Sequence, residues 1–369
     1  MQPGRTVFAQ LMDHVTRFEF QTCVARYDGE YKVSRFSCWD QYLCMAFAQL
    51  TYRESLRDVE ACLRALQSKL YHVGIRARVS RSTLADANET RDWRIYADFT
   101  QGLIRTARAL YLDDPLAVDL ANTVYALDAT VIDLCLSVFP WAHYRSTDAG
   151  VKLHAQLDLR GLIPTVVQIT EGKAPDVAFL DDILIEAGAI YILDRGYVDF
   201  ARLYRFTTEA GFFITRWKRN LRYQRRTSHP VDYQTGLISD QTVVCALAKA
   251  RADYPALLRR VHYLDPVTQH RFVFMSNNFM LPALTIAQLY KSRWQVELFF
   301  ESSTWCTPSV PIEFQGSIDA NQGLVGSPHR SVRCGIARRP LYAASKERRR
   351  TAASPATGSA ESSARCWST

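Results

Sequence analysis

The chain has 369 residues, of which 48% are hydrophobic and 22% are charged, a balance typical of a folded protein with two or more structural units. No apolar run reaches the roughly 18 residues of a membrane-spanning helix, and the first residues lack an apolar signal core. The sequence therefore argues against a membrane or secreted protein and predicts a cytoplasmic one, and its net charge of +8 is weak evidence for a polyanionic partner.

Residues 1–100 are predicted to form a helical domain. Three of their segments carry apolar residues at helical spacing: 6–19, 39–51 and 55–71. After a basic turn, Ser80 is of a type that favours the N-terminal cap of a helix, here one that begins at Ser82. Helix, short basic turn and helix is the order of a DNA-binding helix-turn-helix, and a helical bundle with a basic surface fits the same pattern.

Residues 101–204 change from helical to strand-like patterns. Five segments are predicted as strands: 124–130, 132–138, 151–158, 165–169 and 189–194. Helices are expected from Phe179 to Ala187 and, after the last strand, through Tyr204. Three antiparallel strands, a helix and a buried strand follow the order of the RNase H-like fold. The chain is therefore predicted to be an α/β (α+β) protein, with the first part of an RNase H-like catalytic core in this range.

Two aspartates, Asp128 and Asp194, each close an apolar strand in this pattern. A carboxylate is costly in a β core unless it reaches a cation or a hydrogen-bond donor at the strand end. Either aspartate alone could be an ordinary turn or helix-cap residue. Together with Glu297, which follows on a predicted helix, they indicate a shared cation site.

Residues 205–285 are predicted to be a β-rich insertion between the second aspartate and the glutamate. Within it, the segment 216–226 is basic and contains no acidic residue. Arginines there would follow a phosphate backbone while the interleaved aromatic rings stack on exposed bases. The residues proposed to contact DNA are Trp217, Arg222, Arg225 and Arg226. A solvated basic loop is the alternative.

Residues 286–300 are predicted to form one core helix. At about 100° per residue, Tyr290, Arg293 and Glu297 fall on one face of this helix. A second face carries apolar residues that would be buried: Leu289, Val296 and Phe300. Periodicity alone also fits an ordinary amphipathic helix with an Arg–Glu pair four residues apart.

Three motifs resemble those of the insertion sequence 4 family of transposases, which are DDE enzymes. They are Leu-Asp-Ala-Thr at Asp128, Leu-Asp-Arg-Gly-Tyr at Asp194, and Tyr-x-x-Arg-x-x-x-Glu from Tyr290 to Glu297. Residues 36–63 also resemble the uncharacterised N-terminal domain of one branch of these transposases, which favours DNA binding by the helical domain. The resemblance implies that the two aspartates and Glu297 are catalytic residues that bind Mg²⁺ or Mn²⁺, whereas Tyr290 and Arg293 hold the transposon end.

The function implied by this resemblance is a DNA transposase that cuts and joins transposon ends by two-metal phosphodiester chemistry. Its partners would be double-stranded DNA, both the terminal inverted repeats and the target, with a homodimer in the DNA complex and no membrane. When bound to DNA it would be associated with the bacterial nucleoid. Two alternatives remain open: an inactive DNA-binding remnant of a transposase, and a different RNase H-like nuclease.

Residues 301–369 differ in kind from the rest of the chain. They are rich in Ser, Ala, Gly, Pro and Arg, a composition typical of disordered segments. The helical period ends after Phe300, and Thr304 stands where the resemblance places a lysine. We interpret this tail as the product of a lost reading frame that impairs the enzyme, with a genuine divergent extension as the alternative.

Overall fold

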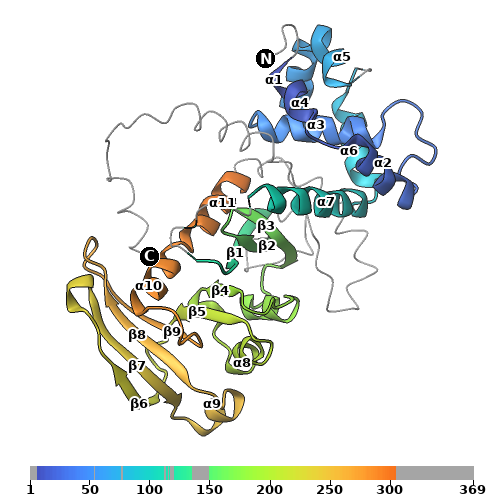
Figure 1. Ribbon diagram of the computed structural model, residues 1–369. Coiled ribbons are helices and arrows are strands. Elements are labelled where there is room, and N and C mark those ends of the chain that lie inside the picture. The colour runs from blue at the N-terminus through green and yellow to red at the C-terminus, as the bar shows by residue number, and fades with distance from the viewer. Residues whose placement is uncertain are drawn as a thin grey trace. The chain divides into compact units, whose positions relative to one another are not determined.

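The computed structural model describes residues 6–53, 55–75, 78–111, 114, 116, 120–134 and 149–304. These residues fall into two compact units, a helical one that ends at Ala109 and one built on a sheet from Leu110 to Phe300 (Figure 1). Among them, no helix is both long and apolar enough to cross a membrane. From residue 305 onward, the predicted disordered tail lies outside the described residues.

The helical unit consists of short helices that begin at polar caps. Its α-helices are α1 (Val7–Met12), α2 (Arg17–Arg26), α3 (Cys38–Leu50), α4 (Leu56–Ala65), α5 (Leu70–Val73), α6 (Arg81–Thr90) and α7 (Arg94–Leu110). The side chains of Ser37, Ser55 and Ser80 accept the N–H of the residue three positions on, which satisfies a free donor of the first helical turn. Ser80 thus caps a helix as predicted, and that helix begins at Arg81.

Two predicted helices of this unit are each divided in the structure. Segment 6–19 becomes α1 and α2, and segment 55–71 becomes α4 and α5 with a 3₁₀ turn between them. Helical spacing did not reveal the second break, because Leu63 and Leu70 on either side of it are both buried in the same core. That core also holds Phe20, whose ring meets Phe99 edge-on with centroids 5.1 Å apart.

The second unit is built on a nine-stranded sheet with the order β3-β2-β1-β4-β5-β9-β8-β7-β6. The strands are β1 (Val124–Leu134), β2 (Ala149–Asp158), β3 (Ile163–Glu171), β4 (Ile190–Leu193), β5 (Phe212–Arg216), β6 (Tyr223–His229), β7 (Leu237–Cys245), β8 (Leu258–Leu264) and β9 (Arg271–Ser276). Strands β1 to β3 are antiparallel, and β4 and β5 run parallel to β1. Strand β9 pairs antiparallel with β5, so the later strands of the insertion, β6 to β9, extend the same sheet. The predicted fold class, an RNase H-like core with a β-strand insertion after a helical N-terminal region, is confirmed.

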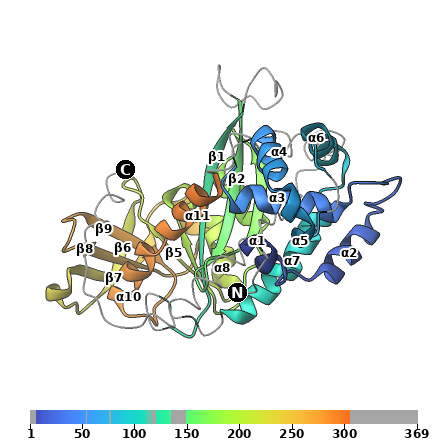
Figure 2. The ribbon, with the colours of Figure 1, turned by 90° about the horizontal axis from the view of Figure 1, so that it is seen from above.

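In the described part of this unit, four α-helices accompany the sheet: α8 (Phe200–Thr208), α9 (Ala248–Asp253), α10 (Ala283–Lys291) and α11 (Trp294–Thr304), of which the last two are orange in Figure 2. Leu203 and Phe206 of α8 share a buried cluster with Tyr125 and Tyr191 of the sheet. Because side chains alternate between the faces of a strand, Asp128 points to the face opposite Tyr125. The side chain of Asp128 therefore lies on the face of β1 that is turned away from α8.

Two details predicted near the sheet were wrong: the break between two strands and one helix. Segments 124–130 and 132–138 were expected as separate strands, but β1 is continuous to Leu134, and residues 135–138 lie outside the described part of the chain. The helix expected from Phe179 to Ala187 is instead a 3₁₀ turn over Asp176–Asp181. There the carbonyls of Leu180 and Ile183 accept from the guanidinium of Arg205, at 3.0 and 3.5 Å, and not from helical N–H groups.

The buried His154 on β2 should make the stability of the sheet depend on pH. Its exposed fraction is 1%, and burial lowers its pKa to about 4. The unfolded chain, with a histidine pKa near 6.5, takes up this proton first, so stability is lost as the pH falls from about 6.5 toward 4, by up to about 3 kcal/mol. Urea unfolding measured from pH 7 to pH 4 should show this loss of stability. In the His154→Gln variant, the part of the loss that comes from His154 should be absent. An equal pH dependence in both proteins would contradict the prediction.

Candidate active site

The two predicted aspartates lie side by side because of the strand register. Leu127 of β1 is paired with Leu193 of the parallel strand β4. Asp128 comes one residue later on β1, and Asp194 directly follows the last residue of β4, so the parallel register places both on the same face. The prediction that Asp128 closes its strand was wrong, because β1 continues past this residue in its pairing with β2. Asp128 lies directly after the last residue of β1 that pairs with β4, so β4 does not continue beside its carboxylate.

The third acidic residue is joined to the first by an arginine. Nη1 of Arg293 donates to Oδ2 of Asp128 at 2.5 Å, and Nη2 of the same guanidinium donates to Oε1 of Glu297 at 2.6 Å. The phenol of Tyr290 donates a long hydrogen bond of 3.4 Å to Oδ1 of Asp194. All five residues of the three motifs therefore meet at one place, although up to 165 positions separate hydrogen-bonded partners.

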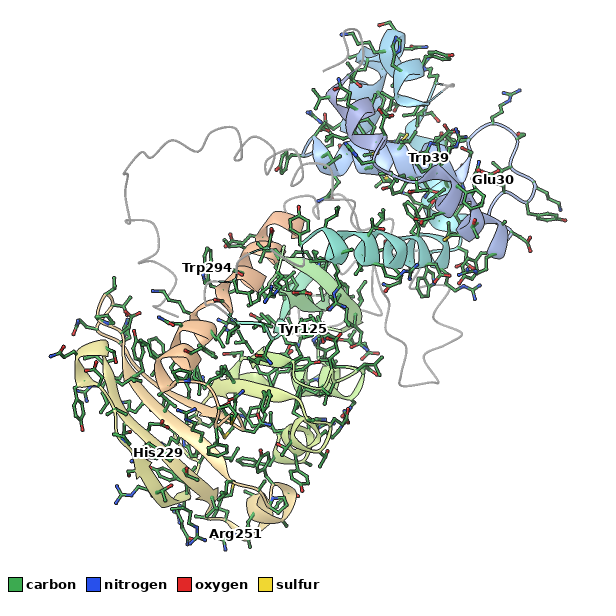
Figure 3. The ribbon with its side chains drawn as sticks, in the orientation of Figure 1. Glu30, Trp39, Tyr125, His229, Arg251 and Trp294 are labelled. Carbon is green, nitrogen blue, oxygen red and sulfur yellow. The ribbon has the colours of Figure 1, made fainter. Side chains whose placement is uncertain are left out.

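These contacts come from two helices, where the sequence predicted one. Tyr290 lies in the last turn of α10, Arg293 in the turn between the helices, and Glu297 in the first turn of α11. Trp294, labelled in Figure 3, begins α11. The apolar stripe was predicted correctly, since Leu289, Val296 and Phe300 are buried. Their burial fixes both helices against the sheet and so holds the polar residues toward the aspartates.

Burial dominates the electrostatics of this cluster. It raises the pKa of Asp128 to about 6, against the opposing effect of Arg293, and the charges of Asp194 and Glu297 raise this pKa further. Burial also opposes the charge of Arg293, but the neighbouring Asp128, Tyr290 and Glu297 hold its pKa above the ordinary value. Asp194 and Glu297 thus lie close enough to Asp128 to disfavour its charged form, and the positive charge of Arg293 opposes this effect.

The sequence did not single out Tyr197, which the structure places beside the same carboxylates. Its side chain is 1% exposed, and its hydroxyl has no hydrogen-bond partner among the described residues. Burial raises the pKa of Tyr197, as do the nearby charges of Asp128, Asp176 and Asp194. The signal was present in the motif, because Tyr197 follows Asp194 by three positions and the 3₁₀ turn Arg195–Tyr197 carries it back into the core.

The donor atoms of this cluster fit a hard divalent cation. Mg²⁺ and Mn²⁺ prefer carboxylate oxygens, and Asp128, Asp194 and Glu297 supply them. Within the described residues, no three His, Cys, Asp or Glu side chains already form a metal-binding group. The guanidinium of Arg293 pairs with two of the three carboxylates and so offsets part of their negative charge.

The residues predicted to contact DNA lie elsewhere on the sheet. Arg222, Arg225 and Arg226 are exposed, and the last two belong to β6, which ends the sheet order. Figure 3 shows this region around the labelled His229. Trp217 is half-buried: its ring meets that of Tyr223 edge-on at 5.1 Å, and the guanidinium of Arg260 lies 5.7 Å from it. The three arginines are therefore exposed to solvent, whereas Trp217 packs against its neighbours.

A pair of aspartates on adjacent strands of an RNase H-like sheet, with a glutamate on a later helix, defines the class of DDE enzymes. Residues 120–304, half of the chain, match the family described as transposase DDE domain. The chain belongs to this family. Residues 3–76 match a domain of unknown function, DUF4372, which places the chain in the predicted branch. The narrower assignment to the insertion sequence 4 family stays a prediction.

Two relatives carry transposase names. The chain is 32% identical to the putative transposase y4zB of Sinorhizobium fredii over 221 residues, which are 59% of this chain and 60% of that protein. It is 29% identical over 196 residues to the probable transposase for insertion sequence element IS5377 of Geobacillus stearothermophilus, over 53% of this chain and 49% of that one. The matches thus span about half to three-fifths of the relatives' lengths.

Proposed function

We propose that this chain is a DNA transposase in which Asp128, Asp194 and Glu297 are the catalytic carboxylates. The observation that supports the proposal best is the meeting of the three motifs, because the strand register and the contacts of Arg293 bring together acidic residues from distant parts of the chain. Structural packing alone rarely gathers three acidic side chains, since each carboxylate must lose hydration when buried.

The same carboxylates would hold Mg²⁺ or Mn²⁺. When bound, two such cations activate the attacking oxygen and stabilise the leaving oxygen of a phosphodiester. The chain's own residues would orient the DNA: Tyr290 and Arg293 lie beside the carboxylates, and a guanidinium can bind phosphate through two parallel hydrogen bonds. The hydroxyl of Tyr197, which has no hydrogen-bond partner among the described residues, lies near the charges of Asp128 and Asp194.

The proposal is tested by the cleavage of DNA that carries the terminal repeats flanking the gene. We expect cuts at the repeat ends with Mg²⁺ or Mn²⁺ and none with a chelator. Cleavage of any duplex without regard to the repeats would favour a different RNase H-like nuclease. Repeat binding without cleavage would favour an inactive remnant. A homodimer in the DNA complex is part of the proposal, and the mass of that complex in solution measures it.

The exposed arginines of the insertion are proposed to bind the phosphate backbone. Replacing Arg222, Arg225 and Arg226 by Gln should reduce the slope of log affinity against log salt by about 0.9 for each phosphate that no longer binds an arginine, or up to about 2.7 for all three. Lys173→Gln, which removes an exposed charge from the turn after β3, is the matched control. If the slope stays unchanged in the triple variant, the segment is a solvated surface.

The C-terminal segment is proposed to impair the enzyme. In the structure α11 continues through Thr304, so the helix extends beyond Phe300, where the apolar period ends. Replacing the residues after Phe300 by a helix with an apolar stripe and a lysine at position 304 should fix Glu297 more firmly. A misplacement near 1 Å can cost about a hundredfold in rate, so cleavage should rise by up to this factor. Equal cleavage by both versions would show that the segment is harmless.

A further inference from the structure

The guanidinium of Arg293 contacts one oxygen of each of two carboxylates that are proposed to bind a metal ion. Its two ion pairs use Oδ2 of Asp128 and Oε1 of Glu297, which are two of the three proposed ligands. The side chains of Arg293 and Asp128 are 18% and 19% exposed, so water screens the ion pair between these two residues little. A divalent cation bound to the same carboxylates would lie within a few ångströms of the guanidinium, and the repulsion between the two positive charges would disfavour binding of both.

Arg293 is placed so that its side chain can leave without disturbing either helix. It lies in the turn between α10 and α11, where its N–H donates to the carbonyl of Tyr290 at 3.1 Å and its own carbonyl accepts from Val296 at 3.0 Å. Only side-chain torsions need to change for the guanidinium to move. Its Nε is buried and has no hydrogen-bond partner among the described residues, so the group can still gain contacts elsewhere.

We infer that Arg293 is an internal counter-ion that a divalent cation displaces, and that the displaced guanidinium then binds a DNA phosphate. This inference rests on the proposed function, since it takes the three carboxylates as the metal ligands. Before metal binds, the arginine offsets part of the negative charge of Asp128 and Glu297. After metal binds, the same side chain is free for the substrate. Metal and DNA would therefore favour each other's binding, and this coupling must be reciprocal.

The test is the affinity of the full chain for Mn²⁺ without DNA, measured by calorimetry. Arg293→Gln should bind Mn²⁺ at least about tenfold more tightly than the unmodified protein, because no guanidinium competes. Arg293→Lys should fall between them, since one ammonium group cannot bridge both carboxylates as a planar fork does. Lys249→Gln removes an exposed positive charge from α9 and controls for net charge. Circular dichroism establishes that each variant is folded.

Asp128→Asn separates failure of this inference from failure of the proposed function. If Asp128→Asn binds Mn²⁺ as well as the unmodified protein does, the proposed metal site is wrong. If Asp128→Asn loses Mn²⁺ while Arg293→Gln and Arg293→Lys both bind it as the unmodified protein does, the site stands and the counter-ion role is wrong. A second readout is DNA affinity with Ca²⁺ added to prevent cleavage. Ca²⁺ should raise this affinity severalfold in the unmodified protein and less in Arg293→Gln.

Discussion

Replacing Asp128 by Asn is expected to lower metal-dependent DNA cleavage by about a thousandfold or more, because the variant loses a charged ligand at the centre of the cluster. Asp194→Asn should have an effect of the same order. DNA affinity measured without metal should be retained in both variants, or rise slightly, since each change removes a negative charge that faces phosphate. Cleavage of a labelled duplex with the terminal repeats measures the first quantity, and a gel-shift titration measures the second.

Asp232→Asn is the matched control for these variants. Asp232 is exposed and caps a short 3₁₀ turn by accepting the N–H of Gln234, a role that Asn fulfils equally well. The Asp232→Asn variant should cleave DNA at the rate of the unmodified protein. Cleavage within about tenfold of normal by Asp128→Asn would contradict the assignment of the carboxylates.

Replacing Arg259 by Met should destabilise the sheet unit by about 3–5 kcal/mol, because it leaves a buried carboxylate without its counter-ion. Arg259 on β8 pairs with Asp240 on β7 through two hydrogen bonds of 2.9 and 2.7 Å, and both side chains are less than a tenth exposed. Its third nitrogen donates to the carbonyls of Asn278 and Leu281, at 3.3 and 2.5 Å. The arginine thus ties the inserted strands to the loop that leads into α10.

Urea unfolding followed by circular dichroism measures this loss. The neighbouring Arg260→Met is the control, because Arg260 is only half-buried and lies over the rings of Trp217 and Tyr223. Arg260→Met should lower the free energy of unfolding by about 1 kcal/mol. Replacing Arg259 and Asp240 together by apolar residues should destabilise less than Arg259→Met alone, since no unpaired charge remains. A loss below about 1 kcal/mol for Arg259→Met would show that the pair does not stabilise the sheet.

The sequence predicted the fold class and the three acidic motifs because both depend on local patterns. Alternating and fully apolar segments mark strands, and a polar residue at the end of such a segment stands out, as Asp194 does. Strand partners and register are set by contacts between distant residues, which no local pattern contains. The pairing of Leu127 with Leu193, which makes Asp128 a neighbour of Asp194, came only from the structure.

The arrangement of Arg293 was also beyond the sequence. Periodicity predicted its ion pair with Glu297 four residues away, but its pair with Asp128 depends on how the helices pack on the sheet. The division into α10 and α11 escaped prediction because the turn at Ser292 and Arg293 contains neither Gly nor Pro. Tyr197 was missed although it belongs to the Asp194 motif, because its burial beside the carboxylates depends on contacts between distant parts of the chain.

We propose that Asp128, Asp194 and Glu297 together bind a divalent metal. Anomalous scattering from crystals of the full chain grown with Mn²⁺ tests this most directly. We expect a Mn²⁺ peak within coordination distance of carboxylate oxygens from all three residues, with the guanidinium of Arg293 moved away from Asp128. Mn²⁺ bound only elsewhere on the chain, with Arg293 still on Asp128 and Glu297, would contradict the claim.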